Sequence, residues 1–272
     1  MMEEWRLITD PPQGGFENMA ADEALLRSAA AERAFRPVLR LYGWTGPTVS
    51  LGYLQKAAPF AGLGVPLVRR VTGGRALLHD FEFTYAVIAG AGNPLYSMGI
   101  SGCYSAVSRA IVLTLREFGI EAEFSRPSSP AAYRRSGACF ASSARYEVLV
   151  RGRKIAAGAQ RRVKHGLLQH GSIIFGLNTE LWSTIFGEEV AVKTATVSEF
   201  CKVERELFGQ VFVEKAGGAL QASFTPAGLT GAEAELKQRL IDQKYSRREW
   251  NEDARIPEPS TSTEDFMAVG AL

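Results

Sequence analysis

Cysteine is scarce in this sequence, which contains only Cys103, Cys139 and Cys201. The number is odd, and no two of the cysteines stand in CxxC spacing. This argues against a disulfide framework and against a zinc site, since both need paired cysteines at short intervals. Each cysteine is therefore interpreted from its own surroundings.

Long apolar runs and an excess of one charge are also missing. No segment reaches the roughly 18 unbroken apolar residues of a membrane span, and residues 1–6 lack a cationic start followed by an apolar stretch. Lys and Arg number 31 against 29 Asp and Glu, so the net charge of +2 does not resemble that of a nucleic-acid binder, although a local basic face stays open. We expect a cytoplasmic monomer that binds neither nucleic acid nor a membrane.

The length and composition suit one globular catalytic unit. The 272 residues are 46% hydrophobic, which is enough for a substantial core, and no repeat of 20 to 50 residues is present. Residues 254–272 are of low complexity, typical of a disordered segment. We expect a single domain over residues 1–251 and a disordered tail over 252–272.

Hydrophobic periodicity predicts a mixed α+β fold. Helices are expected at 18–31, with Asn18 as the N-cap, at 100–118, and over most of 178–245. Strands are expected at 5–9, 38–42, 48–53, 66–71, 76–79, 83–88, 121–124, 146–150, 154–159 and 166–175.

Two of the cysteines read as structural. Cys103 lies on the periodic helix 100–118, and Cys201 follows Val197 and Phe200 in another expected helix, where a buried cysteine behaves as a small hydrophobe. Cys139 differs, because it lies beyond the Pro/Ser/Ala/Arg-rich stretch 126–138 and just before the strand 146–150. It is a loop cysteine.

Three stretches concentrate polar chemistry. Residues 69–80 read Arg-Arg-Val-Thr-Gly-Gly-Arg-Ala-Leu-Leu-His-Asp, in which a glycine pair joins two strands in a hairpin. Glycines let the backbone approach a ligand, but such a pair is usually only a turn. His79 is either a satisfied core histidine or a site residue, and the two readings stay even beside the arginine-rich turn.

The second and third stretches are similarly ambiguous. Residues 146–160 predict two strands around a tight Arg-Gly-Arg turn, with Lys154 opening the second strand before Ile-Ala-Ala-Gly-Ala. This lysine is either solvated or placed to polarise an acyl carbonyl or favour a thiolate. Residues 166–175 place Gln-His-Gly-Ser inside an apolar strand, and these polar groups need partners, either structural or in a pocket.

Taken together, the stretches resemble the biotin/lipoate protein ligase and octanoyltransferase superfamily. The likeness extends to Asn-Met-Ala-Ala-Asp-Glu-Ala-Leu-Leu at 18–26 and Lys-Tyr-Ser-Arg-Arg-Glu-Trp-Asn at 244–251, so it spans about residues 5–251. The branch most similar is the LipM-type octanoyltransferases, whose nucleophilic cysteine precedes a Tyr-Glu strand. Cys139 and Lys154 match that pattern. The resemblance implies a biotin/lipoate ligase-like catalytic domain of α+β class, with largely antiparallel sheets flanked by helices.

The resemblance also implies a mechanism without ATP, metal or other cofactor. Cys139 takes the octanoyl group from octanoyl-acyl carrier protein, and a lysine of a lipoyl domain or of the glycine-cleavage H protein then attacks the thioester. Lys154 lowers the thiol pKa and holds the carbonyl. The substrate-binding residues expected from the same resemblance are Arg70, Gly73, Gly74, Arg75, His79, Gly158, His170, Gly171 and Ser172.

Further roles follow from the same comparison. Backbone N–H groups around Gly73, Gly74, Gly171 or Ser172 are candidates for an oxyanion site. Small residues are candidates for the acyl slot, and arginines, more often simply a solvated face, are candidates for docking an acidic carrier protein. These are Ala76, Ala156, Ala157 and Ala159 for the slot, and Arg69, Arg70, Arg75, Arg161 and Arg162 for docking.

Two alternatives and one departure stay open. An ATP-dependent lipoate-protein ligase shares the fold, but ligases show a third glycine where this chain has Arg75 and an Asn-containing segment where it has residues 81–85. A non-catalytic relative that only binds lipoyl domains or acyl chains is the other alternative.

The stretch after Lys-Ile usually reads Ala-Gly-Ser/Asn-Ala-Gln, and here it is Ala-Ala-Gly-Ala-Gln at 156–160, which puts the chain-length preference in question. A simple hairpin leaves Cys139 far from Lys154, so we expect the loop 140–144 to fold back.

Overall fold

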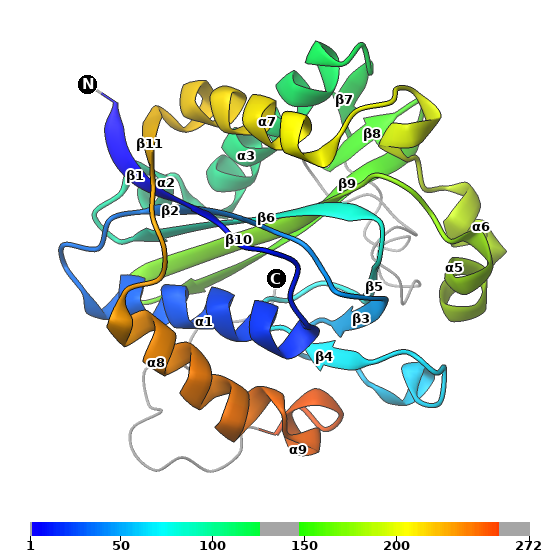
Figure 1. Cartoon of the computed structure of the whole chain (residues 1–272), viewed down its shortest axis with the longest axis horizontal. Coiled ribbons are helices and arrows are strands. Elements are labelled where there is room, and N and C mark those ends of the chain that lie inside the picture. Colours follow the sequence, from blue (N-terminus) through cyan, green and yellow to red (C-terminus); the bar gives the residue numbers. More distant parts are fainter. Residues whose placement is uncertain (1, 126–146, 256–272) are drawn as a thin grey trace.

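The centre of the protein is an eight-stranded mixed sheet with the strand order β11-β1-β2-β6-β10-β9-β8-β7 (Figure 1). We describe a computed structural model, which covers residues 2–125 and 147–255. The strands are β1 (Glu3–Thr9), β2 (Val38–Tyr42), β6 (Glu82–Gly90), β7 (Ala122–Phe124), β8 (Val148–Val150), β9 (Arg153–Val163), β10 (Gly166–Ile174) and β11 (Ala222–Pro226). A second sheet, β4-β3-β5, consists of β3 (Thr48–Leu51), β4 (Leu67–Arg69) and β5 (Leu77–His79).

Most strand pairs are antiparallel. Among the described strands only β1–β11, β1–β2 and β3–β4 are parallel. This confirms the predicted class, an α+β fold with mixed and largely antiparallel sheets. Residues 256–272 of the expected tail lie outside the described part of the chain.

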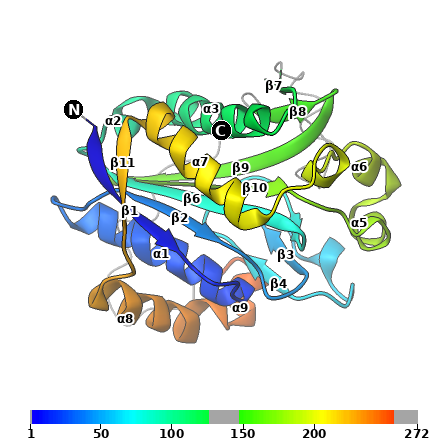
Figure 2. The same ribbon diagram turned by 45° about the horizontal axis from the view of Figure 1, so that its top comes forward.

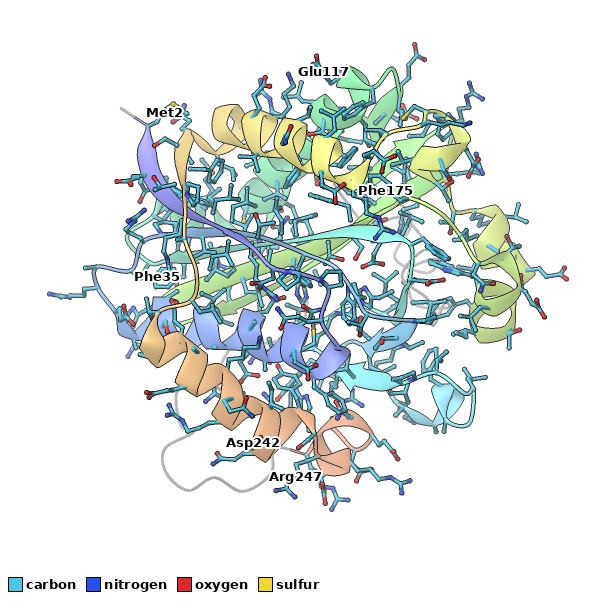
Figure 3. All side chains as sticks on the ribbon, in the orientation of Figure 1. Met2, Phe35, Glu117, Phe175, Asp242 and Arg247 are labelled. Carbon is cyan, nitrogen blue, oxygen red and sulfur yellow. The ribbon has the colours of Figure 1, made fainter. Side chains whose placement is uncertain are left out.

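Helices cover both faces of the large sheet (Figures 1 and 2). One face carries α3 (Gly99–Glu117) and α7 (Arg205–Leu220), with α2 (Pro94–Ser97) before α3. The other face carries α1 (Gly15–Ala31), α8 (Gly231–Leu240) and the small sheet. The remaining elements are η1 (Ala58–Phe60), α5 (Thr179–Phe186), α6 (Glu188–Val192), η3 (Val197–Glu199), the π-helix η4 (Ile241–Tyr245) and α9 (Arg248–Asn251). Side chains fill the layers between these helices and the sheets (Figure 3), and in the described ranges no helix is long and apolar enough to span a membrane.

Most predicted elements are confirmed to within a few residues, because their apolar periods match the faces that become buried. Helix α1 ends at Ala31 as expected, but it begins at Gly15, and the prediction of Asn18 as its N-cap is wrong. The buried Asn18 amide donates instead to the carbonyl oxygens of Gln13, at 3.3 Å, and Gly43, at 2.9 Å. Gln13 lies just before the helix in the chain, whereas Gly43 lies in a loop that only the tertiary fold brings to it.

The predicted hairpin at residues 151–153 is confirmed, whereas the glycine pair at 73–74 does not form one. Arg151 and Gly152 have φ of 50° and 74° between β8 and β9, as a type I′ turn requires. By contrast, β4 and β5 do not pair with each other but lie on opposite sides of β3. Residues 70–76 therefore pass from one side of β3 to the other.

Most of the stretch from residue 178 to 245 is helical, as predicted, but it also contains a strand that was not expected. Strand β11 interrupts it and pairs in parallel with β1 at the sheet edge, so its backbone partners come from the other end of the chain. Cys201 follows the short η3 turn and lies outside any helix, half-buried against the core of the α3/α7 face. Cys103 lies on α3 as expected, where burial raises the pKa of its thiol to about 12, so it is inert.

The middle of the large sheet has room for a tyrosine because β10 carries glycine beside it. Tyr85 on β6 is the register partner of Gly171, which in turn pairs with Gly158 on β9. A Cβ built on Gly171 would lie 2.5 Å from the phenolic oxygen of Tyr85 and 2.5 Å from the carbonyl oxygen of Ala157. No side chain fits there without moving a strand.

The C-terminal helices are attached to α1 by a buried carboxylate. Glu23 accepts from the ammonium of Lys244 at 2.7 Å, from the Tyr245 hydroxyl at 2.6 Å and from Arg27 at 2.6 Å. Burial by itself raises the pKa of Glu23, but the charges of Lys244 and Arg27 outweigh it and lower the pKa to about 2. The cluster is thus held in its charged form.

We expect Gly171→Ala to lower the free energy of unfolding by about 1–3 kcal/mol, because the added methyl group has nowhere to go. Gly218→Ala is the matched control. It lies in α7, its added Cβ would meet nothing within 4 Å, and it should leave stability unchanged or raise it by up to about 1 kcal/mol. Chemical denaturation monitored by circular dichroism measures both. Equal effects at the two positions would contradict this account of Gly171.

Stability should fall as the pH drops from about 4.5 toward 2, because the folded pKa of Glu23 lies near 2 and its ordinary value is 4.5. To bind a proton, the folded state must break the ion pairs of Glu23, whereas the unfolded chain binds the proton readily. The free energy of unfolding therefore falls by on the order of 3 kcal/mol. Denaturation series across this range measure the slope. In Glu23→Gln the protein is less stable at pH 7 and this part of the slope is absent; an unchanged slope would show that Glu23 is not its source.

Candidate active site

A cavity lies between the middle of the large sheet, the small sheet and helix α1. The space between its walls, including the part open to solvent, is about 420 Å³. It is lined by Met19, Tyr42, Ser50, Arg70, Gly74, Leu77, His79, Thr84, Ala157, Gly158, Ala159, His170, Gly171 and Ser172. Seven of the nine expected substrate-binding residues are in this set, and Gly73 and Arg75 are not.

One wall of the cavity is apolar. Ala157 and Ala159 alternate along β9 on the face toward the small sheet, and Met19 and Leu77 lie with them. Ala156 is buried in the core of the opposite face, as the two-residue period of a strand requires, and Ala76 is buried behind the small sheet. Only two of the four alanines expected at an acyl slot therefore reach this cavity.

The other wall is polar and begins with His170. Its Nδ1 lies 2.8 Å from Oδ2 of Asp22, and its Nε2 lies 2.7 Å from the Thr72 hydroxyl. Pairing with a carboxylate places the ring proton on Nδ1, so the Thr72 hydroxyl donates to Nε2. Burial lowers the pKa of His170, although the contact with Asp22 raises it. The lowered pKa favours the neutral ring.

Asp22 itself is held by helix α1 and strand β2. Its other partners are Arg40, at 2.7 Å, and the hydroxyl of Tyr42, at 2.9 Å. Burial raises the pKa of this carboxyl, but Arg40 and His170 together outweigh burial and lower it. The group is therefore a buried anion that fixes His170 in place.

The second histidine of the polar wall, His79, forms a parallel arrangement. Its Nδ1 lies 2.6 Å from Oε1 of Glu82, and its Nε2 lies 2.7 Å from the Ser50 hydroxyl. Thr84 and Ser172 donate to the same Glu82 oxygen, at 2.6 and 2.7 Å. The sequence left His79 between a core and a site residue, and the structure places it on the cavity wall with its ring fully paired.

Arg70 closes the polar wall from the loop after β4. One guanidinium nitrogen donates to the Ser50 carbonyl, at 2.9 Å, and to the Ser50 hydroxyl, at 3.0 Å. The other donates to the carbonyl oxygens of Gly73, at 2.9 Å, and Arg75, at 2.7 Å. Arg70 therefore shapes the glycine loop, and it faces the cavity rather than the surface.

Arg69 and Arg70, which were candidates for docking a carrier protein or for a solvated face, are both buried and form neither. Arg69 is fully buried, and its guanidinium donates to main-chain oxygens on both sides of it. Trp250 donates back to the Arg69 carbonyl at 2.8 Å, so this arginine joins the C-terminal helix α9 to the small sheet. Arg161 and Arg162 are half-buried and lie over the rings of Tyr53, at 5.1 Å, and Tyr96, at 4.4 Å.

The backbone amides of Gly171 and Ser172 cannot form an oxyanion site. Strand β10 has β6 on one side and β9 on the other, so its N–H groups are used in the two ladders. Of the four candidates, Gly73 and Gly74 lie outside the strands, and Gly74 lines the cavity.

Lys154 is buried at the start of β9, and its ammonium lies 2.7 Å from a carboxylate oxygen of Glu147. Its main chain pairs with the segment after α6. Lys154 is not among the residues found to line the cavity in the described part of the chain. Cys139 and the loop 140–144 lie outside the described residues; Glu147 is the first residue described after them.

Several site residues escaped the sequence reasoning. Ser50 carries no motif, Thr72 was only one member of the 69–80 stretch, and Asp22, Glu82 and Thr84 were noted only for their local context. Glu147, the partner of Lys154, was treated as part of a strand. Their shared signal is a polar side chain within an otherwise apolar element, which indicates a buried partner but not its identity.

Comparison with known proteins gives the family. The model of the lipoyl protein ligase A/B catalytic domain matches residues 15–224. The octanoyltransferase LipM of Geobacillus kaustophilus is 37% identical over 92% of this chain and 98% of its own, and that of Carboxydothermus hydrogenoformans is 35% identical over 92% and 98%.

Among solved structures, a T. acidophilum protein described as a lipoate protein ligase, with bound lipoic acid, superposes with a TM-score of 0.77. It is 25% identical, and the match covers 92% of this chain and 99% of that one. The fold expected from the sequence resemblance is thereby confirmed. The chain belongs to the lipoyl protein ligase A/B family, and within it to the LipM-type octanoyltransferases.

Proposed function

We propose that the protein transfers an octanoyl group from octanoyl-acyl carrier protein to a lysine of a lipoyl domain or of the glycine-cleavage H protein. The observation that carries this proposal is the cavity, which joins an alanine wall to a wall of paired polar groups, in a chain whose relatives are octanoyltransferases. An octanoyl thioester has the same division, with a long apolar chain and a single polar end.

The alanine wall suits the acyl chain. Ala157 and Ala159 leave the space that larger side chains would fill, and burial of each methylene contributes about 0.8 kcal/mol. The polar wall suits the carbonyl end, because buried polar groups exclude an alkyl chain that cannot hydrogen-bond to them.

The transfer runs in two steps that balance without ATP. The Cys139 sulfur attacks the thioester carbonyl, a new C–S bond forms, and the carrier thiol leaves. The acceptor amine then attacks the octanoyl-cysteine, a C–N bond forms, the C–S bond breaks, and the amine proton ends on the Cys139 sulfur.

Lys154 supplies positive charge near the point where the Cys139 segment rejoins the sheet. Its partner Glu147 is eight residues after Cys139 in the chain. In this proposal the ammonium moves from the carboxylate to the thiolate or to the acyl carbonyl during the reaction.

Intact-mass measurement after incubation with octanoyl-acyl carrier protein, without ATP, tests the covalent step. The wild type should gain one octanoyl group and Cys139→Ala none, because Cys103 is buried and inert and Cys201 does not line the cavity. Cys201→Ala is the matched control and should load like the wild type. Loading of Cys139→Ala would remove that residue from the mechanism, and activity only with ATP and free octanoate would favour the ligase.

Chain-length preference tests the alanine wall. The wild type should favour octanoyl over hexanoyl donors by roughly tenfold in kcat/KM, since two methylenes contribute about 1.6 kcal/mol. Ala159→Leu should reduce or reverse this ratio by filling the slot opposite His170. Paired assays with the two donors measure it, and an unchanged ratio would place the acyl chain elsewhere.

A further inference from the structure

A continuous chain of hydrogen bonds crosses the polar wall of the cavity from Arg70 to Glu82. Arg70 donates to the Ser50 hydroxyl at 3.0 Å, Ser50 lies 2.7 Å from His79 Nε2, and His79 Nδ1 lies 2.6 Å from Glu82. Ser50, His79 and Arg70 all line the cavity. These hydrogen bonds therefore link the Arg70 guanidinium to the buried Glu82 carboxylate along the cavity in which the thioester is proposed to bind.

The direction of this chain is fixed. The Glu82 carboxylate accepts and cannot donate, so the His79 ring carries its proton on Nδ1. Nε2 is then an acceptor, which the Ser50 hydroxyl satisfies. The Arg70 guanidinium only donates, so it occupies a lone pair of the Ser50 oxygen and leaves the hydroxyl proton pointing to His79.

The chain is also held rigidly. The indole of Trp44 stacks on the His79 ring, with centroids 3.7 Å apart and planes 15° apart. Thr84 and Ser172 hold Glu82 Oε1, and Trp44 donates to Thr84 at 3.0 Å. Glu82 Oε2 is buried without a partner among the described residues, so the carboxylate keeps acceptor capacity to stabilise an imidazolium.

The second half-reaction needs a proton acceptor. A lysine side chain has an ordinary pKa of about 10.4, so it is an ammonium near pH 7 and must lose a proton before its nitrogen can bond to the carbonyl. Lys154 is an ammonium paired with Glu147 and carries no acceptor site in that form.

We propose that Ser50 and His79 accept the proton of the incoming lysine, with Glu82 as the positioning residue. This inference rests on the proposed octanoyl transfer. The acceptor ammonium gives one proton to the Ser50 oxygen while the Ser50 proton passes to His79 Nε2, and the neutral amine then forms the C–N bond. As the C–S bond breaks, the second nitrogen proton passes to the cysteine sulfur and the imidazolium releases the first proton to solvent, so protons balance.

The His170 arrangement offers a contrast within the same wall. Thr72, the hydroxyl paired with His170, is fully buried and does not line the cavity. A substrate in the cavity therefore cannot pass a proton to the Thr72 hydroxyl. The Thr72–His170 hydrogen bond instead holds the loop 70–76 against β10. Thr72→Val is a matched control for Ser50→Ala, because each variant removes one hydroxyl that donates to a histidine.

The experiment starts from isolated octanoyl-enzyme and follows loss of the octanoyl group by mass. Two acceptors are compared, namely a lipoyl domain and hydroxylamine, an amine that is already neutral at pH 7. Ser50→Ala and His79→Asn should slow transfer to the lipoyl lysine by roughly a hundredfold, in the range of general-base catalysis. Transfer to hydroxylamine should change by less than threefold.

The pH profile gives a second readout. The charged and titratable groups around His79 are Glu82, Arg70, His170 and Asp80, and none of them is altered in Ser50→Ala. In this variant the lysine reaction should recover steeply toward pH 10, where the acceptor amine becomes neutral in solution. Glu82→Gln should show a smaller loss with the same recovery.

The outcomes are separable. Equal slowing with both acceptors, as expected for Thr72→Val, would make Ser50 and His79 structural and overturn the inference, as would lysine transfer at the wild-type rate in both variants. Failure of the wild type to form any octanoyl-enzyme would instead overturn the proposed function before the variants are compared.

Discussion

The buried carboxylate of Asp22 is the contact on which the site depends. It lies on helix α1, and its partners are Arg40 and Tyr42 on β2 and His170 on β10. One side chain therefore joins the helix layer to two strands of the large sheet and fixes a cavity-lining ring. Separating α1 from β2 and β10 would leave the buried Asp22 charge unpaired, which costs several kcal/mol of stability. The three elements therefore stay together, and His170 stays in place.

The next acidic residue on the same helix, Glu23, has a different task. It points to Lys244 and Tyr245 and so attaches the C-terminal helices. Trp250 in α9 then pairs with Arg69, the residue before Arg70. The two adjacent carboxylates thus support the cavity from two directions, directly through His170 and indirectly through the strand that leads into the glycine loop.

The two faces of strands β9 and β10 have different roles. On one face of β9 and β10, Gly158 and Gly171 make room for Tyr85 and close the core, and on the other face Ala157, Ala159, His170 and Ser172 form the cavity. The same strands therefore supply stability and recognition without conflict, since alternate residues point to opposite sides. This explains why small residues are interleaved with polar ones in the two stretches.

The sequence by itself determined the class of fold, nearly all strands of the central sheet, the inert nature of Cys103 and, through its motifs, the family. Local periodicity and turn chemistry are enough for these, as the Arg151-Gly152 turn illustrates. Only the tertiary structure decided that residues 73–74 do not make a hairpin, that β11 joins β1, that Arg69 is buried, and that Ser50, Glu82 and Glu147 are the partners of His79 and Lys154. The physical reason is that these outcomes depend on which distant groups satisfy a buried charge or backbone edge, and residue spacing along the chain carries no record of that choice.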